Sequence, residues 1–155
     1  MASESKSKAE EVVRAIRDRG GDAVWVQADV PEATQVRSLV DRTVAAFGGL
    51  DYAFNNGGSG GKARLTAEMD ERDWDKTIDG HLKSVWLCMK YEIPEMLKRG
   101  GGVIVNNSSV DGLRAYPVPA GAAYSAAKHG VIGLCSERAT FVVGAALAID
   151  GGYLA

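Results

Sequence analysis

The chain has 155 residues, of which 46% are hydrophobic, and its formal net charge is −2 with a pI near 5.7. This length predicts a single domain over residues 1–155, and the hydrophobic content suffices for a buried core. The charge balance argues against a nucleic-acid-binding protein. No apolar run reaches membrane-spanning length and the charged first residues are unlike a signal peptide, so we expect no membrane partner and a cytoplasmic location.

Helical and strand patterns alternate along the chain. Glycine pairs close the first two helices, and Pro94 is expected to kink the third or to end it early. The periodic apolar residues of the third helix include Trp74 and Trp86, which predicts that both lie in the core. Cys88 and Cys135 are predicted to be buried thiols. The expected helices are 10–19, 31–47, 70–99 and 122–134, and the expected strands are 23–26, 50–54, 103–107 and one near 146–149.

Alternation of this kind predicts an α/β fold with a parallel sheet. In such folds, functional groups gather where strands end. Two strands end in polar sequences, which are Asn-Asn-Gly-Gly at 55–58 and Asn-Asn-Ser-Ser at 106–109. The glycines near 57–61 do not form a phosphate-binding loop, because Asn56 and Ala63 stand where that motif requires glycine and a hydroxyl. His81 and His129 lack a third ligand, so no metal site is expected.

Tyr124 and Lys128 are four residues apart within a predicted helix, so their side chains share one face. A phenol ordinarily titrates near pH 10, and a fixed ammonium beside it favours the phenolate. Such a pair suits proton transfer to and from an alcohol or carbonyl oxygen. A serine hydroxyl from the preceding loop could hold that oxygen.

These motifs, their order and the terminal Asp150-Gly151-Gly152 resemble the short-chain dehydrogenase/reductase family over nearly all the chain. The resemblance implies a Rossmann-like three-layer α/β/α fold with a parallel sheet, and an oxidoreductase acting on a small alcohol or carbonyl substrate. It implies that Ser109 positions the substrate oxygen, that Tyr124 is the acid/base, and that Lys128 binds the nicotinamide ribose. His81 stands where the family often has a catalytic asparagine.

The resemblance also implies a nicotinamide cofactor, NAD or NADP, without deciding between them. By position, the residues expected to bind it are Tyr124 and Lys128, together with Asp29, Val30, Asn55, Asn56 and Gly57. The sequence matches the family from the family's second helix onward, without the glycine-rich turn that holds the pyrophosphate. We therefore expect weak dinucleotide binding. The alternative prediction is a catalytically inert member of the family or an interaction protein.

Two further departures concern the fold. The family places more residues between 138 and 141 than this chain does, and its first two strands have no counterpart in this sequence. The expected sheet brings the 23–26 strand beside the 50–54 strand. Most helices would then cover one face, which leaves an apolar face exposed and predicts a homo-oligomer.

Overall fold

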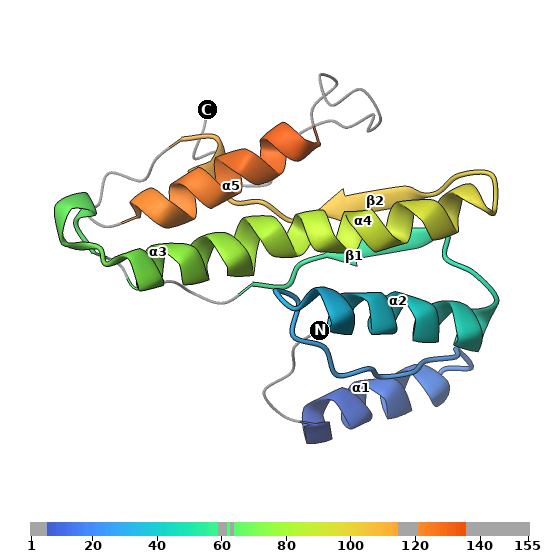
Figure 1. Ribbon diagram of the computed structural model, residues 1–155. Coiled ribbons are helices and arrows are strands. Elements are labelled where there is room, and N and C mark those ends of the chain that lie inside the picture. Colours follow the sequence, from blue (N-terminus) through green and yellow to red (C-terminus); the bar gives the residue numbers. More distant parts are fainter. Residues whose placement is uncertain (1–5, 59–61, 63, 115–120, 136–155) are drawn as a thin grey trace. The chain divides into compact units, whose positions relative to one another are not determined.

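A computed structural model of the chain describes residues 6–58, 62, 64–114 and 121–135 (Figure 1). These residues divide between two compact units. The first unit comprises Met1–Ala53 and Leu87–Val103, and the second comprises Phe54–Trp86 and Ile104–Ala155. The predicted strand near 146–149 and the junction at 138–141 lie outside the described residues.

The first unit is built from helices α1 (Lys6–Arg17) and α2 (Ala33–Phe47) and from α4 (Ser84–Leu97) from Leu87 onward. Val36 of α2 packs with Leu87 and Cys88 of α4, and this cluster is its buried centre. Helix α2 ends at Phe47 and is capped by Gly48, whose φ of 79° is in the left-handed region that glycine adopts without strain. The glycine stops predicted for the first two helices are confirmed at Gly20 and Gly48.

The strand predicted at 23–26 is wrong, since residues 21–29 have no regular secondary structure. A strand requires a neighbour that completes its ladder of hydrogen bonds. The sheet in the described part of the chain consists of β1 (Tyr52–Asn55) and β2 (Val103–Asn106) alone. The expected pairing of 23–26 with the next strand is therefore not formed.

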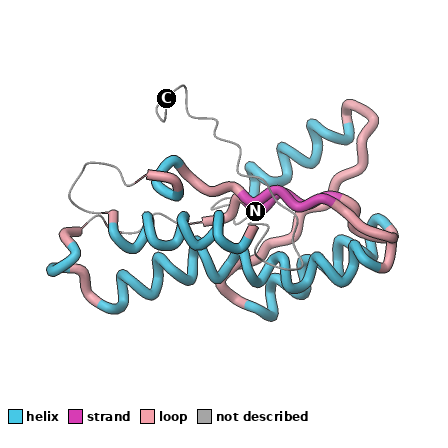
Figure 2. Tube along the Cα trace, turned by 90° about the horizontal axis from the view of Figure 1, so that it is seen from above, coloured by secondary structure: helices cyan, strands magenta, loops and turns pink. Residues whose placement is uncertain are grey.

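Strands β1 and β2, magenta in Figure 2, are hydrogen-bonded neighbours that run in the same direction (Figure 1). The N–H of Val103 donates to the carbonyl of Asp51 at 3.0 Å, and that of Asn107 donates to Asn55 at 2.9 Å. From the first of these bonds to the second, the donor and the acceptor both move four residues forward in the sequence. The strands therefore run in the same direction, and Val105 lies beside Phe54. Phe54 is 67% exposed and Val105 is 49% exposed, so apolar side chains of this pair face outward.

The predicted helix at 70–99 is a run of three parts, α3 (Glu71–Ile78), the π-helical turn η2 (Asp79–Lys83) and α4. In the π turn the N–H of Ser84 donates to the carbonyl of Asp79, five residues earlier. Pro94 lies inside α4, which continues to Leu97. None of the described helices is long and apolar enough to cross a membrane.

The prediction that Trp74 and Trp86 lie in the core is wrong, because both are exposed. The middle of the helical run packs on α5 (Ala122–Leu134) through other residues. Leu82 lies over Gly130, and His81 lies against Tyr124. Helix α5 has the predicted bounds. Cys88 is buried as predicted, whereas Cys135 is half-buried.

Candidate active site

Helix α5 presents Tyr124 and Lys128 on one side, as their spacing predicts. The Nζ atom of Lys128 lies 5.6 Å from the centroid of the Tyr124 ring. Lys128 is only 7% exposed, and Ala127 and Val131 beside it are buried as well. At this exposure the side chain of Lys128, ammonium included, stands in a largely water-excluded position.

The Lys128 ammonium donates a hydrogen bond to the carbonyl oxygen of Asn107 at 3.0 Å. Asn107 directly follows β2, so the contact joins the α5 side chain to the end of the sheet. Burial lowers the pKa of Lys128 below its ordinary value of 10.5. The carbonyl of Asn107 offers partial negative charge to the ammonium in return.

Two serine hydroxyls fasten the loop after β2 to α5. Ser108 Oγ donates to the carbonyl of Lys128 at 2.8 Å, and Ser125 Oγ donates to the carbonyl of Asp111 at 2.9 Å. Gly112 completes the contact, since a Cβ there would lie 2.5 Å from Ser108 Oγ and 2.7 Å from the Lys128 carbonyl oxygen. Sequence reasoning assigned no role to Ser108, Gly112 or Ser125. Their only signal was the polar composition of the loop.

Ser109 begins the short 3-10 turn η3 (Val110–Gly112), which packs against α5. Its Oγ accepts the backbone N–H of Asp111 at 3.3 Å. The hydroxyl proton of a serine that accepts in this way remains available for donation. Ser109 therefore lies in the loop that is fastened to the Tyr124 helix, and its role toward a substrate stays a prediction.

His81 is 6% exposed and lies in the π turn η2. Its ring meets the Tyr124 ring in a T-shaped arrangement, with centroids 4.9 Å apart and an interplanar angle of 87°. The structure thus brings His81, Tyr124 and Lys128 together. Turns of π type occur frequently at functional sites, because one extra residue reshapes the helix locally. The sequence periodicity gave no sign of this turn.

Paired asparagine side chains hold the ends of the two strands. Asn55 Nδ2 donates to Asn106 Oδ1 at 2.9 Å, and Asn107 Nδ2 donates to Asn56 Oδ1 at 2.5 Å. Asn55 is buried, while Asn56 and Gly57 are exposed. These amide pairs fix the polar edge from which the Asn107 carbonyl meets Lys128.

Asp29 and Val30 belong to the first unit. The N–H of Asp29 donates to Gln35 Oε1 at 2.9 Å, and its carbonyl accepts from Glu32 at 3.0 Å, at the start of α2. Val30 packs against the buried cluster of that unit. Their predicted contact with a cofactor stays a prediction.

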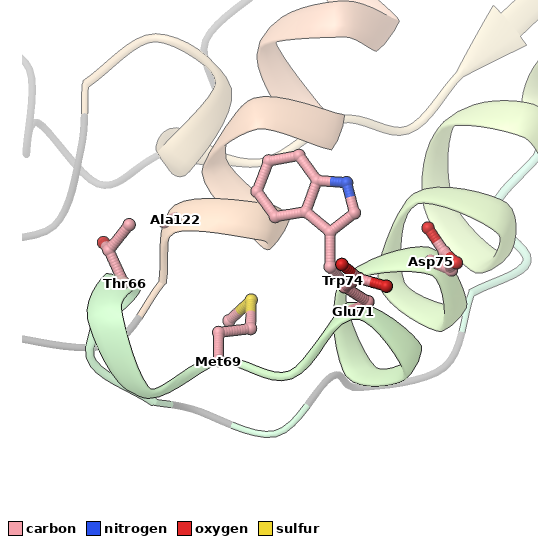
Figure 3. Close-up of a pocket in the computed structure, with 6 residues that line it drawn as sticks. All are labelled: Thr66, Met69, Glu71, Trp74, Asp75 and Ala122. Atoms are coloured by element: carbon pink, nitrogen blue, oxygen red, sulfur yellow. The ribbon is translucent and has the colours of Figure 1, made fainter.

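A separate cavity of about 250 Å³ lies in the second unit, with Trp74 and Met69 on its wall (Figure 3). Its lining residues are Thr66, Met69, Glu71, Trp74, Asp75 and Ala122. Ala122 and Tyr124 are two residues apart on α5, so they point in directions about 200° apart. Tyr124, Lys128 and His81 are not among the residues that line this cavity.

A model of the short chain dehydrogenase family matches residues 1–143. The chain belongs to this family. The sequence of the 3-oxoacyl-(acyl-carrier-protein) reductase FabG of Staphylococcus aureus (strain Mu50) is 42% identical over 135 residues, which are 87% of this chain and 54% of that protein. The family recognised from the motifs is thereby confirmed.

Solved structures of short-chain dehydrogenases share the fold. A 3-ketoacyl-ACP reductase from Sinorhizobium meliloti 1021 matches with a TM-score of 0.83 and 32% identity, over 88% of this chain and 53% of that one. Carveol dehydrogenase from Mycobacterium avium, in complex with NAD, matches with a TM-score of 0.82 and 35% identity, over 89% of this chain and 50% of that one. The Rossmann-like α/β class is confirmed, with a sheet that is incomplete relative to the family. The chain spans about half the length of these relatives.

Proposed function

We propose that this protein is a nicotinamide-dependent oxidoreductase that interconverts a small alcohol and the corresponding carbonyl compound. The observation that carries the proposal is the buried Lys128 ammonium, held by the Asn107 carbonyl and set 5.6 Å from the Tyr124 ring. A buried cation beside a phenol stabilises negative charge on the phenol oxygen. This is the property that an acid/base tyrosine requires.

The residues around Lys128 fit the ribose end of a nicotinamide dinucleotide. A lysine ammonium has three N–H donors, and within the described residues only the bond to Asn107 engages Nζ. The remaining donors suit the hydroxyls of a ribose. Asn56 and Gly57, exposed at the end of β1, offer further polar backbone and side-chain groups at the same edge of the second unit. When bound, the nicotinamide supplies or accepts a hydride at the substrate carbon.

In the proposed reaction, oxidation of an alcohol removes a hydride from carbon and a proton from oxygen. The Tyr124 phenolate takes the proton, and the Ser109 hydroxyl donates a hydrogen bond to the same substrate oxygen. In the reverse direction the Tyr124 phenol returns the proton to the carbonyl oxygen. The Lys128 ammonium stays near the Tyr124 ring throughout, and His81 supports the same ring through its edge-to-face contact.

The test is turnover of NAD(H) or NADP(H) by the purified chain with a panel of secondary alcohols and ketones. Tyr124→Phe should lose at least about a hundredfold in kcat, which is the usual contribution of a positioned acid/base. Tyr91→Phe is the matched control, since Tyr91 also has a lysine near its ring, with Lys90 Nζ 5.5 Å from the centroid. That variant should keep its activity.

Equal activity in Tyr124→Phe and the parent chain would overturn the assignment. Absence of turnover with every substrate and both cofactors would instead favour the alternative of an inert family member. The choice between NAD and NADP, the homo-oligomeric state and the cytoplasmic location remain predictions.

A further inference from the structure

Gly58 lacks a side chain at the point where the His81 ring lies. A Cβ atom built on Gly58 would be 2.5 Å from Nδ1 and 2.7 Å from Cε1 of His81. Carbon atoms in proteins pack at about 3.5–4.0 Å, so no residue with a Cβ fits at position 58 unless the imidazole moves. Gly58 and His81 are twenty-three residues apart in sequence, and no local pattern links them.

The imidazole has little freedom to move. It is buried, and the Tyr124 ring meets it edge to face at 4.9 Å. The π turn that carries it is held at its end, where the Ser84 N–H donates to the Asp79 carbonyl and Ser84 Oγ donates to the Gly80 carbonyl at 2.8 Å. A displaced His81 ring would therefore press on Tyr124 or lose contact with it.

Gly58 follows a strand end that is held by side-chain hydrogen bonds. It follows β1 by three residues, and the amide pairs at Asn55 and Asn56 fix the end of that strand. The carbonyl oxygen of Gly80 lies 3.6 Å from the same Cβ position, an ordinary van der Waals distance. An added methyl group at residue 58 therefore meets the π turn chiefly through the His81 ring.

We propose that Gly58 is a positioning residue for Tyr124 and that it acts through His81. Because Gly58 has no side chain, the His81 imidazole can occupy the space in which it contacts the Tyr124 ring and holds that ring in place. Gly58 touches neither substrate nor cofactor in this assignment. The effect on turnover rests on the proposed oxidoreductase function, whereas the ring contact itself does not.

The ring contact can be measured without any activity. In the parent chain, nuclear Overhauser cross-peaks should connect the His81 imidazole protons with the Tyr124 ring protons. Gly58→Ala should abolish or strongly weaken them. Gly133→Ala, which adds a Cβ with no atom within 4 Å, should leave them unchanged. Cross-peaks of parent intensity in a folded Gly58→Ala variant would overturn the proposal.

A thermal double-mutant cycle tests the route through His81. Gly58→Ala should lower the melting midpoint by at least about 3 °C, as expected for an overpacked contact in a chain of this size. In a His81→Asn background, whose shorter side chain vacates the space, the same substitution should lower the midpoint by less than half as much. Equal losses in both backgrounds, or failure of both Gly58→Ala proteins to fold, would overturn the proposal.

Kinetics add a readout that separates this inference from the proposed function. If turnover is found, Gly58→Ala should lower kcat about tenfold with KM little changed, and His81→Asn in the same chain should restore part of it. An intact kcat in Gly58→Ala would count against positioning of Tyr124. If the parent chain shows no turnover, the proposed function fails, and the cross-peaks and the melting cycle still decide the role of Gly58.

Discussion

The Nζ atom of Lys128 lies 5.6 Å from the centroid of the Tyr124 ring and is fixed there by the Asn107 carbonyl oxygen. The i, i+4 spacing places both side chains on one face of α5, but spacing alone leaves a lysine free to extend into water. Burial and the hydrogen bond to Asn107 are what keep the ammonium near the phenol. Burying the charged form of Lys128 consequently lowers the free energy of unfolding, and this effect depends on pH because the ammonium can lose its proton.

That cost predicts a rise in stability at alkaline pH. Burial lowers the pKa of Lys128 in the folded protein below 10.5, so the folded state loses its proton before the unfolded state does. As pH rises through the lowered pKa toward 10.5, the free energy of unfolding of the parent should increase relative to that of Lys128→Met. Denaturant unfolding of both proteins between pH 7 and 10.5 measures the difference.

Lys90→Met is the control for this experiment, because Lys90 is exposed and lies at a similar distance, 5.5 Å, from the Tyr91 ring. The pH-dependent change should be smaller for Lys90→Met than for Lys128→Met, because the Lys90 side chain is exposed to water. A constant or falling difference for Lys128→Met would contradict the expected cost of burying the charge.

Gly112→Ala should destabilise the protein by about 1–3 kcal/mol, the usual effect of overpacking. The added methyl group would collide with Ser108 Oγ and with the Lys128 carbonyl, which share a 2.8 Å hydrogen bond. Equilibrium unfolding in urea measures the loss. Gly133→Ala on α5 is the matched control, where a Cβ meets open space and helix propensity favours alanine. Equal stability of the two variants would show that the loop yields.

The two cysteines should differ sharply in their reaction with iodoacetamide. Burial, and to a lesser extent the Glu92 carboxylate, raises the pKa of Cys88 to about 12 from 9.0. Cys88 should therefore stay unmodified in the folded protein at pH 8.5, while half-buried Cys135 reacts. Mass spectrometry after a timed reaction identifies the modified residue, and Cys135→Ser should remove the fast phase.

The raised pKa of Cys88 also makes the free energy of unfolding depend on pH. Its contribution falls as the pH rises, whereas the contribution of Lys128 increases. The folded state keeps the Cys88 proton above pH 9.0, where the unfolded state releases it, so this contribution falls between about pH 9 and 12. Rapid alkylation of Cys88 under native conditions at pH 8.5 would contradict the predicted protection of this thiol and the pH dependence that follows from its raised pKa.

Phe54 and Val105 lie beside each other on the parallel pair and remain 67% and 49% exposed. Exposed apolar side chains on a sheet favour self-association and bind reporter dyes. We expect the protein to bind such a dye and to form oligomers, as measured by size-exclusion chromatography with light scattering. Phe54→Ser with Val105→Thr should reduce both signals. A monomer that binds no dye would show that this surface is covered.

Much of the local structure could be predicted from the sequence, because it depends on neighbours in the chain. Helix α5 and the shared face of Tyr124 and Lys128 follow from spacing, and the end of α2 follows from a glycine at a position of positive φ. The motifs at 55–58, 104–109 and 124–128 also identified the family that the comparison confirms.

Only the tertiary structure decided which of these residues meet. The strand expected at 23–26 was wrong because a strand exists through a partner, and its own composition supplies none. Trp74 and Trp86 fit the apolar period of their helix, yet α5 packs on Leu82 and His81 instead. The contacts of Ser108 with Lys128 and of Gly58 with His81 join residues twenty or more positions apart, where packing in space, and no periodicity along the chain, brings them together.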